Sequence, residues 1–152
     1  MATKVAQDRL GELLVREGLI TAEQLQKALR EARESDTRLG YALVKLGFVQ
    51  EEHLTRMLAK QYRVQAVDLT KVTVDPKILK TITGEVAYKH MVLPLRRVGR
   101  TLTIAMANPS DLGAIDDLKF ITRYEIEPVI VGEYTLRKHL ERYYGKEDAR
   151  VS

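Results

Sequence analysis

Residues 9–61 contain one sequence pattern written twice, and this duplication constrains the fold more than any other feature of the chain. Arg-Leu-Gly opens the copies at residues 9–11 and 38–40, so the second copy lies 29 residues (38 − 9) after the first. The copies also share the spacing of their leucines and a second glycine. Core packing explains repeated apolar residues, but it does not explain a repeated arginine. The repeat therefore predicts two equivalent half-sites, for a ligand with two equivalent halves or for a long ligand that crosses both.

Signals for four short helices, a duplicated helical hairpin, lie between residues 7 and 62. N-cap residue types precede the first three helices: Asp8, Thr21 and Thr37. Gln24 completes a capping box at the second of these caps. Gly18 and Gly47 suit the left-handed backbone position that ends a helix.

Apolar stripes at three- and four-residue spacing predict the inward faces of these helices. The second helix carries Leu25, Ala28, Leu29 and Ala32, and the third carries Leu39, Leu43 and Leu46. Residues 33–37 read as a polar connector between them. On the fourth helix Leu54, Met57, Leu58 and Gln61 face one way.

The pattern changes after Tyr62 to alternating strand and helix signals. Strands are expected at residues 64–69, 91–97, 100–106 and 125–131, and helices at residues 75–81, 111–121 and 132–144. Val98-Gly99 is a hairpin signal between the second and third of these strands. The fold class is therefore α+β: a helical lobe over residues 1–65, a lobe with a small, mostly antiparallel sheet over residues 66–147, and a frayed tail from 148 to 152.

Composition excludes several classes of protein. The chain has no cysteine, so it has neither disulfides nor a cysteine-based metal site. Its apolar runs are too short for a membrane span or a signal peptide, which favours a cytoplasmic protein that does not insert into the membrane. No phosphate-binding loop or nucleophile motif is present, and His53, His90 and His139 stand apart as expected surface residues. We therefore expect neither an enzyme nor a protein with a metal or cofactor.

The Arg-Leu-Gly segments are the best candidates for a ligand site. If Asp8 and Thr37 are N-caps, Arg9 and Arg38 occupy the first helical position, beside the free amides at the positive end of the helix dipole. An arginine there can bind a phosphate or a guanine edge, and a glycine lets a ligand press onto the backbone. The alternative is that Gly11 and Gly40 only permit close helix packing, with both arginines solvated.

The doubled motif resembles the N-terminal, MshEN-type domain of the assembly ATPases of type II secretion and type IV pili. That family carries two tandem 24-residue motifs separated by five residues, which here would be residues 9–32 and 38–61. Residues 92–95 (Val-Leu-Pro-Leu), 102–109 and the ending Tyr143-Tyr144-Gly145 are similar too. The first motif departs from the pattern at its end, where Ala32 stands in place of glutamine.

This resemblance implies a bacterial regulatory module that binds cyclic di-GMP, one motif for each half of the ligand. The implied residues of the first half-site are Arg9, Leu10, Gly11, Leu14, Leu25 and Leu29. Those of the second are Arg38, Leu39, Gly40, Leu43, Leu54, Leu58 and Gln61. The implied partners are the downstream ATPase domain, which this sequence does not include, or a platform protein of the inner membrane.

Two other functions compete with nucleotide binding. The chain could be a docking domain of a secretion or pilus ATPase whose repeat is purely architectural. It could also bind nucleic acid polymers through its excess of 25 basic over 21 acidic residues. Residues 1–65 hold 11 basic and 9 acidic residues, however, so neither half carries a basic arm, and this evenness argues against a nucleic-acid binder.

Overall fold

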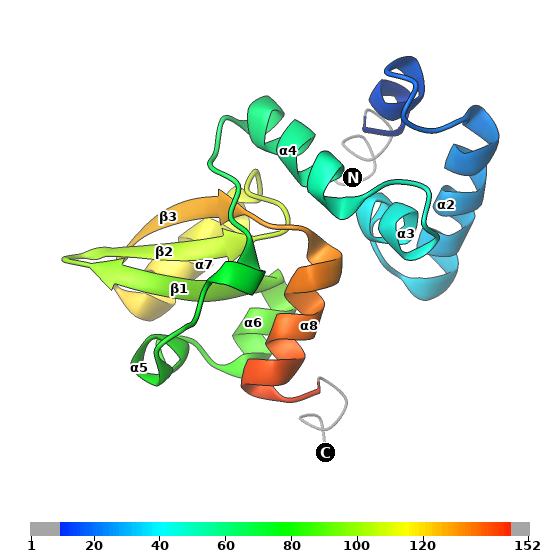
Figure 1. The fold of residues 1–152 in the computed structure, drawn as a ribbon. Helices are drawn as coiled ribbons and strands as arrows, with labels where there is room; N and C mark the ends of the chain where they lie inside the picture. Colours follow the sequence, from blue (N-terminus) through cyan, green and yellow to red (C-terminus); the bar gives the residue numbers. More distant parts are fainter. Residues whose placement is uncertain (1–9, 147–152) are drawn as a thin grey trace. The chain divides into compact units, whose positions relative to one another are not determined.

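The computed structural model describes residues 10–146, which form two compact units that divide between Leu54 and Thr55 (Figure 1). The division falls inside helix α4 (Glu51–Tyr62), earlier than the lobe boundary expected at residue 65. The expected cap Asp8 and the tail 148–152 lie outside the described residues.

Four helices appear where the duplicated sequence predicts them. Residues 10–16 are helical, followed by α2 (Ala22–Ser35), α3 (Leu39–Lys45) and α4. The core of the first unit comes mostly from the repeated positions: Leu14, Ile20, Ala28, Ala32, Leu39, Ala42, Leu43 and Leu54. An ion pair of 2.7 Å between Lys45 Nζ and Glu31 Oε1 joins α3 to α2.

Three of the predicted helix ends are confirmed. Thr21 and Gln24 form the reciprocal capping box of α2, with N–O distances of 2.9 and 3.0 Å. Gly18 and Gly47 have φ of +75° and +77°, which glycine adopts without strain. Both hairpins therefore turn at a left-handed glycine.

Three local expectations for this unit are wrong. Arg38, not Thr37, is the N-cap of α3, so Gly40 is the second helical residue rather than the third. The polar connector is shorter than residues 33–37 because α2 continues to Ser35 and ends at Asp36 in the left-handed region (φ 53°). Leu46 is exposed because it follows the last helical residue of α3 and leaves the inward stripe.

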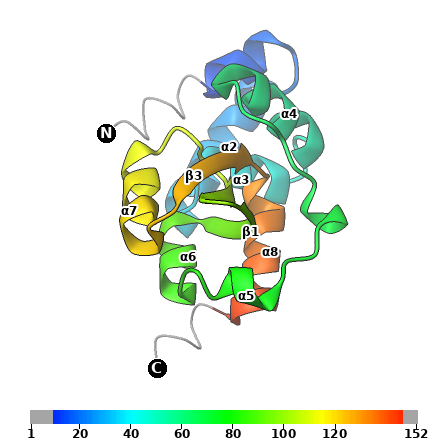
Figure 2. The ribbon, with the colours of Figure 1, turned by 90° about the vertical axis from the view of Figure 1, so that its left-hand side faces the viewer.

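The second unit is α+β, as expected. After α4 its elements are a 3₁₀ turn η1 (Leu69–Lys71), α5 (Pro76–Leu79), α6 (Gly84–His90), β1 (Val92–Val98), β2 (Thr101–Met106), α7 (Leu112–Thr122), β3 (Glu125–Ile130) and α8 (Glu133–Tyr144). The sheet order is β1-β2-β3, with β1–β2 antiparallel and β2–β3 parallel. The sheet is thus mixed rather than mostly antiparallel, because α7 returns the chain to the start of β3 (Figures 1 and 2).

Two elements of this unit differ from the sequence prediction. Residues 64–69 form no strand: Ala66 makes a single bridge to Ile130, and Asp68 then caps η1. Thr70 donates to the Asp68 carboxylate from both its hydroxyl and its amide, and these bonds lower the pKa of Asp68. Helix α6, capped by Thr83, was not anticipated.

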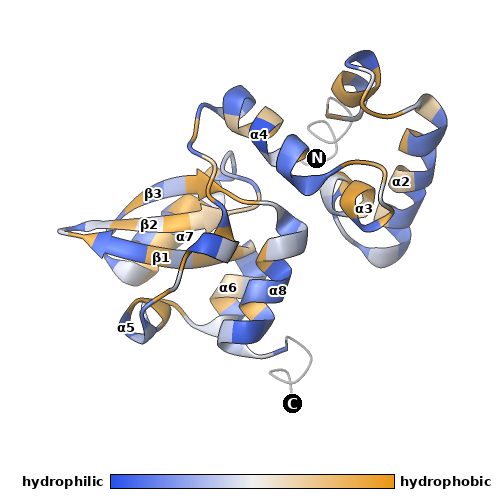
Figure 3. Ribbon diagram, in the orientation of Figure 1, coloured by the Kyte–Doolittle hydropathy of each residue, from blue (hydrophilic) through white to orange (hydrophobic). Residues whose placement is uncertain are grey.

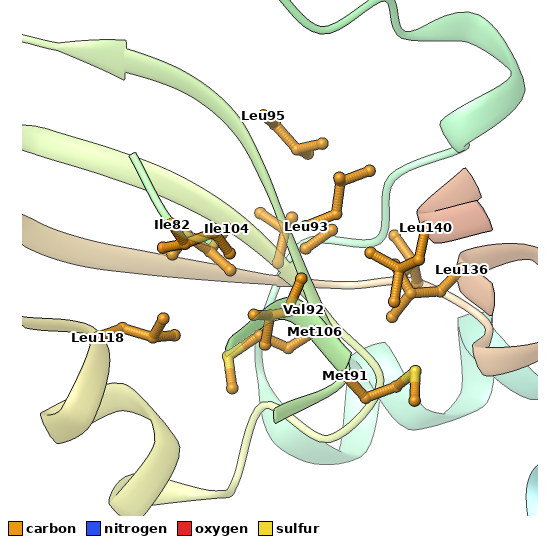
Figure 4. Packing of buried hydrophobic residues seen from close by; sticks show 14 of the residues in the cluster. Ile82, Met91, Val92, Leu93, Leu95, Ile104, Met106, Leu118, Leu136 and Leu140 are labelled. Atoms are coloured by element: carbon orange, nitrogen blue, oxygen red, sulfur yellow. The ribbon is translucent and has the colours of Figure 1, made fainter. Parts of the chain in front are cut away.

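The core of the second unit lies where strands and helices meet at one end of the sheet. Val92 to Leu95 are all buried, whereas Arg96 to Val98 at the hairpin tip are exposed. Figure 4 shows Leu118 of α7 and Leu136 and Leu140 of α8 packing around these residues. Figure 3 shows the same change along β1, which becomes hydrophilic toward its tip. The inward direction of Leu136 and Leu140 is confirmed.

Tyrosines hold the ends of this unit in place. The hydroxyl of Tyr144 donates to the Leu79 carbonyl (2.7 Å), and that of Tyr143 accepts from the Val74 amide (3.4 Å). Tyr88 donates to the Gly145 carbonyl (2.6 Å). Through these long-range bonds Tyr143 and Tyr144 anchor the last helix.

The histidines are not all on the surface. His139 is buried, and its Nδ1 lies 3.0 Å from the Thr135 carbonyl oxygen, because α8 turns that face toward the core. His90 is mostly shielded, and its Nε2 lies 3.1 Å from Oδ2 of Asp117 on α7. Only His53 is fully exposed, as expected.

Candidate ligand-binding site

The duplicated sequence forms the same helix–helix contact twice. A Cβ placed on Gly11 would lie 2.7 Å from Cδ1 of Leu25, and one placed on Gly40 would lie 3.2 Å from Cδ2 of Leu54. Gly40 and Leu54 each stand 29 residues after Gly11 and Leu25. In each copy, the glycine of Arg-Leu-Gly thus packs against the motif leucine of the next helix. The repeated Arg-Leu-Gly glycines have a packing role in this structure.

The turns of the two hairpins are equivalent as well. The amide of Gly18 donates to the Val15 carbonyl (3.0 Å), and that of Leu19 donates to the Leu14 carbonyl (3.0 Å). In the second copy, the same two bonds run from Gly47 to Val44 (3.0 Å) and from Phe48 to Leu43 (2.9 Å). This pair of bonds is the Schellman arrangement. The two copies are therefore structural repeats down to their backbone hydrogen bonds.

Arg38 lies at the start of the second copy, where α3 begins. Its backbone is extended (φ −82°, ψ 157°), and its carbonyl accepts the first helical bond from Ala42 (3.1 Å). The side chain is half-buried, and its Nη1 atom is shielded from solvent. The Arg38 side chain thus lies against the protein. The alternative in which the glycines only permit close helix packing expected this arginine to be solvated. Arg9, its counterpart, lies outside the described residues.

The leucines of the implied site fall into two groups. Leu14, Leu39 and Leu43 have no exposed surface, and Leu54 is 6% exposed. These four are core residues of the first unit. The others are half-buried: Leu10, Leu25, Leu29 and Leu58. In this conformation only the half-buried leucines have surface that a ligand can contact. The role of each leucine in ligand binding stays a prediction.

The fourth helix carries the remaining candidates. Leu54, Leu58 and Gln61 lie four and three residues apart on α4, so they share one face of that helix. Gln61 is exposed. Leu58 and Gln61 belong to the second compact unit, whereas Arg38 and Gly40 belong to the first.

The two copies differ at two points. The capping box of Thr21 and Gln24 has no equivalent, since Gln50 and His53 stand at the matching positions. Ala32 is 5% exposed, whereas its counterpart Gln61 is exposed. Position 32 is therefore part of the core, and the sequence departure there has a packing reason.

The described residues contain no group of three His, Asp or Glu side chains that could hold a metal ion. The ion pair of Lys45 with Glu31 was not anticipated, although a cation repeats at Arg16 and Lys45. Among the helices that the structure describes, none is both long and apolar enough to cross a bilayer.

A comparison with family models matches the MshEN domain over residues 62–150. This match covers the α+β elements and not the doubled motif of residues 9–61. The type IV pilus assembly ATPase PilB of Myxococcus xanthus (strain DK1622) is 50% identical over 139 residues, which are 91% of this chain and 25% of that protein. The chain thus spans about a quarter of the length of this relative.

Two solved structures share the fold. One, described as MshE with cdg, has a TM-score of 0.64 and 37% identity, and the match covers 89% of this chain and 98% of that one. The N-terminal domain of XpsE has a TM-score of 0.68 at 20% identity, with coverages of 92% and 96%. The second likeness concerns the fold alone.

Proposed function

The chain belongs to the MshEN domain family, and on that premise we propose that it binds cyclic di-GMP as a regulatory module without catalytic activity of its own. The system it serves would be a type IV pilus or a type II secretion system, since its relatives include a pilus assembly ATPase. The ligand would bias the downstream motor by a shift between conformations that already exist. The module would act in the cytoplasm, beside that motor.

The doubled hairpin is the observation that carries this proposal. Gly11 with Leu25 and Gly40 with Leu54 make one contact twice, at a constant offset of 29 residues. A ligand with two chemically identical halves meets two such elements with the same set of contacts. Cyclic di-GMP has this symmetry. The MshE relative supports the choice, because its structure is described as a complex with cdg, which we read as this dinucleotide.

Arg38 is the side chain to which we assign most of the recognition in the second half-site. A guanidinium offers five donors in a planar fork, which fits a guanine edge or a phosphate. Burial of Nη1 fixes part of the side chain before the ligand arrives, so less rotamer entropy is lost on binding. Leu25 and Leu29, which are half-buried in the first unit, would supply apolar contact to the bases.

Isothermal titration calorimetry of the chain with cyclic di-GMP tests the proposal directly. We expect one ligand per chain and no heat with GTP or linear pGpG as matched controls. Arg38→Ala should weaken binding by about 5- to 150-fold if it holds a guanine bidentately. Its melting temperature should stay close to that of the parent.

The alternative function is docking without nucleotide. The full burial of Leu14, Leu39 and Leu43 favours it, because packing alone then accounts for much of the repeat. Absence of binding heat at high micromolar cyclic di-GMP, with a normally folded chain, would replace the proposal with this alternative.

A further inference from the structure

The tip of the sheet in the second unit carries exposed arginines next to exposed apolar side chains. Arg97, Val98 and Arg100 belong to the β1–β2 hairpin, and Phe120 and Arg123 belong to the end of α7. All five are exposed, with Val98 and Phe120 both at 71%. Together with the half-buried Tyr124 they form what we call the arginine patch.

Three contacts connect parts of the patch. The Arg97 guanidinium lies 5.4 Å from the centre of the Tyr124 ring, and that of Arg123 lies 5.2 Å from the centre of the Phe120 ring. Tyr124 follows Arg123 in the chain. The amide of Glu125 donates to the Arg100 carbonyl (2.7 Å), which closes the hairpin onto the start of β3. Two arginine–aromatic pairs thus lie side by side at one end of the sheet.

The charge of the patch is not neutralised from within the protein. Over the described residues, none of Arg97, Arg100 and Arg123 makes an ion pair with a carboxylate. Glu125 is the acidic residue at its border, and it meets Arg100 through its backbone. Arg96 has a different setting, because it stands opposite Thr103 of β2, which in turn pairs with Glu127 of β3.

Two of the guanidinium groups are held in place before any partner arrives. Arg97 donates to the Gly99 carbonyl (2.8 Å) and also lies over Tyr124, so its orientation is fixed from two sides. Arg123 lies over the Phe120 ring, and its left-handed backbone ends α7 (φ 65°). A fixed planar guanidinium favours planar carboxylates, which accept two parallel hydrogen bonds.

We propose that the arginine patch docks an acidic segment of a partner protein, with carboxylates on the arginines and an apolar side chain against Phe120. Arginine and aromatic residues are the side chains most enriched where protein interfaces gain their binding energy. This surface is independent of the nucleotide site, which lies on the duplicated hairpins.

A titration of the ¹⁵N-labelled chain with an acidic peptide tests the docking proposal. The probe is a synthetic eight-residue peptide that alternates glutamate and leucine, added to millimolar concentration. We expect amide shifts confined to residues 97–101 and 119–125. The triple variant Arg97→Gln, Arg100→Gln, Arg123→Gln should bind about tenfold more weakly or worse, since each exposed charge pair adds a few tenths to 1 kcal/mol to affinity.

Arg96→Gln is the matched control, because it removes an exposed arginine of the same strand outside the patch. It should bind the peptide as the parent does, and both variants should melt as the parent does. Equal losses in both variants, or no shifts at all, would overturn the proposal. Tighter binding of anionic phosphatidylglycerol vesicles or single-stranded DNA than of the peptide would overturn it as well.

Discussion

At the residue scale, the glycines of the Arg-Leu-Gly motifs lack a Cβ, and this absence leaves room for a leucine of the next helix. Both face a leucine of the next helix, but at different distances. At Gly11 a new methyl would lie 2.7 Å and 3.1 Å from the two Cδ atoms of Leu25. At Gly40 the one close atom would be 3.2 Å away, a contact that a small shift of Leu54 relieves. The first hairpin is therefore the more tightly packed of the two at this position.

Gly11→Ala should lower the free energy of unfolding by about 1–3 kcal/mol, the usual effect of overpacking. Gly40→Ala should be close to neutral, because the gain in helix propensity, up to about 1 kcal/mol, offsets a mild contact. Urea-induced unfolding followed by circular dichroism measures both. Gly113→Ala, at an exposed position of α7, is the control, with its nearest atom 3.5 Å from the added Cβ, and it should not destabilise. Equal losses at Gly11 and Gly40 would contradict this account of the two contacts.

Ala32→Gln restores the residue that the family motif carries, yet we expect it to destabilise the chain. Ala32 is 5% exposed and lies on the inward face of α2. A glutamine there adds volume and a polar amide to the core, which costs about 1–3 kcal/mol. Gln61→Ala, at the exposed counterpart, should leave the melting temperature unchanged. A stable Ala32→Gln with tighter nucleotide binding would show instead that the first half-site opens to the ligand.

The helical hairpin is the element that the sequence duplicates, and its turn depends on backbone geometry more than on packing. Gly18 and Gly47 have positive φ, and neither has an atom within 4 Å of an added Cβ. Space is therefore free, and only the left-handed conformation opposes a side chain. A substitution at Gly18 or Gly47 therefore tests the cost of backbone strain without steric overlap. A substitution at Gly11 or Gly40 introduces a steric contact instead.

Gly47→Ala should destabilise by about 1–2 kcal/mol, the cost of placing an L-residue in the left-handed region. Gly47→Asn should recover part of this loss, since asparagine tolerates that region better. Thermal melts of the two variants beside the parent measure the difference. If Ala and Asn are equally harmful, the glycine is required for a reason other than its φ.

At the scale of the whole molecule, the chain consists of two compact units that meet within α4. The first unit holds the duplicated sequence as far as Leu54, whereas the family match covers residues 62–150 of the second. A ligand of the hairpins should therefore leave a local signature in one part of the chain.

Cyclic di-GMP should slow amide hydrogen exchange in residues 10–62 while the amides of β1, β2 and β3 exchange as before. Binding stabilises the helices that contact the ligand against local opening, and the sheet unit has its own core. Hydrogen exchange followed by mass spectrometry, with and without cyclic di-GMP, measures this change in protection. The control is Arg38→Ala, in which the ligand should give no protection. Protection of the sheet alone would place the ligand outside the repeat.

The sequence by itself determined the features that depend on neighbours a few residues apart. The capping box of Thr21, the left-handed Gly18 and Gly47 and the hairpin at Gly99 are all decided by contacts within about five residues. Local backbone preferences are strong enough there to be read directly.

Only the tertiary structure decided the features that depend on distant partners. Residues 64–69 look like a strand, but Ala66 meets one residue, Ile130, and the chain then leaves the sheet. The parallel pairing of β3, the burial of His139 and the burial of Ala32 likewise depend on which elements pack together. So do the contacts of Gly11 with Leu25 and of Gly40 with Leu54, which give these glycines a packing role, while their part in ligand binding stays a prediction. Long-range packing overrides local pattern because burial of apolar surface contributes more free energy than any single residue's preference.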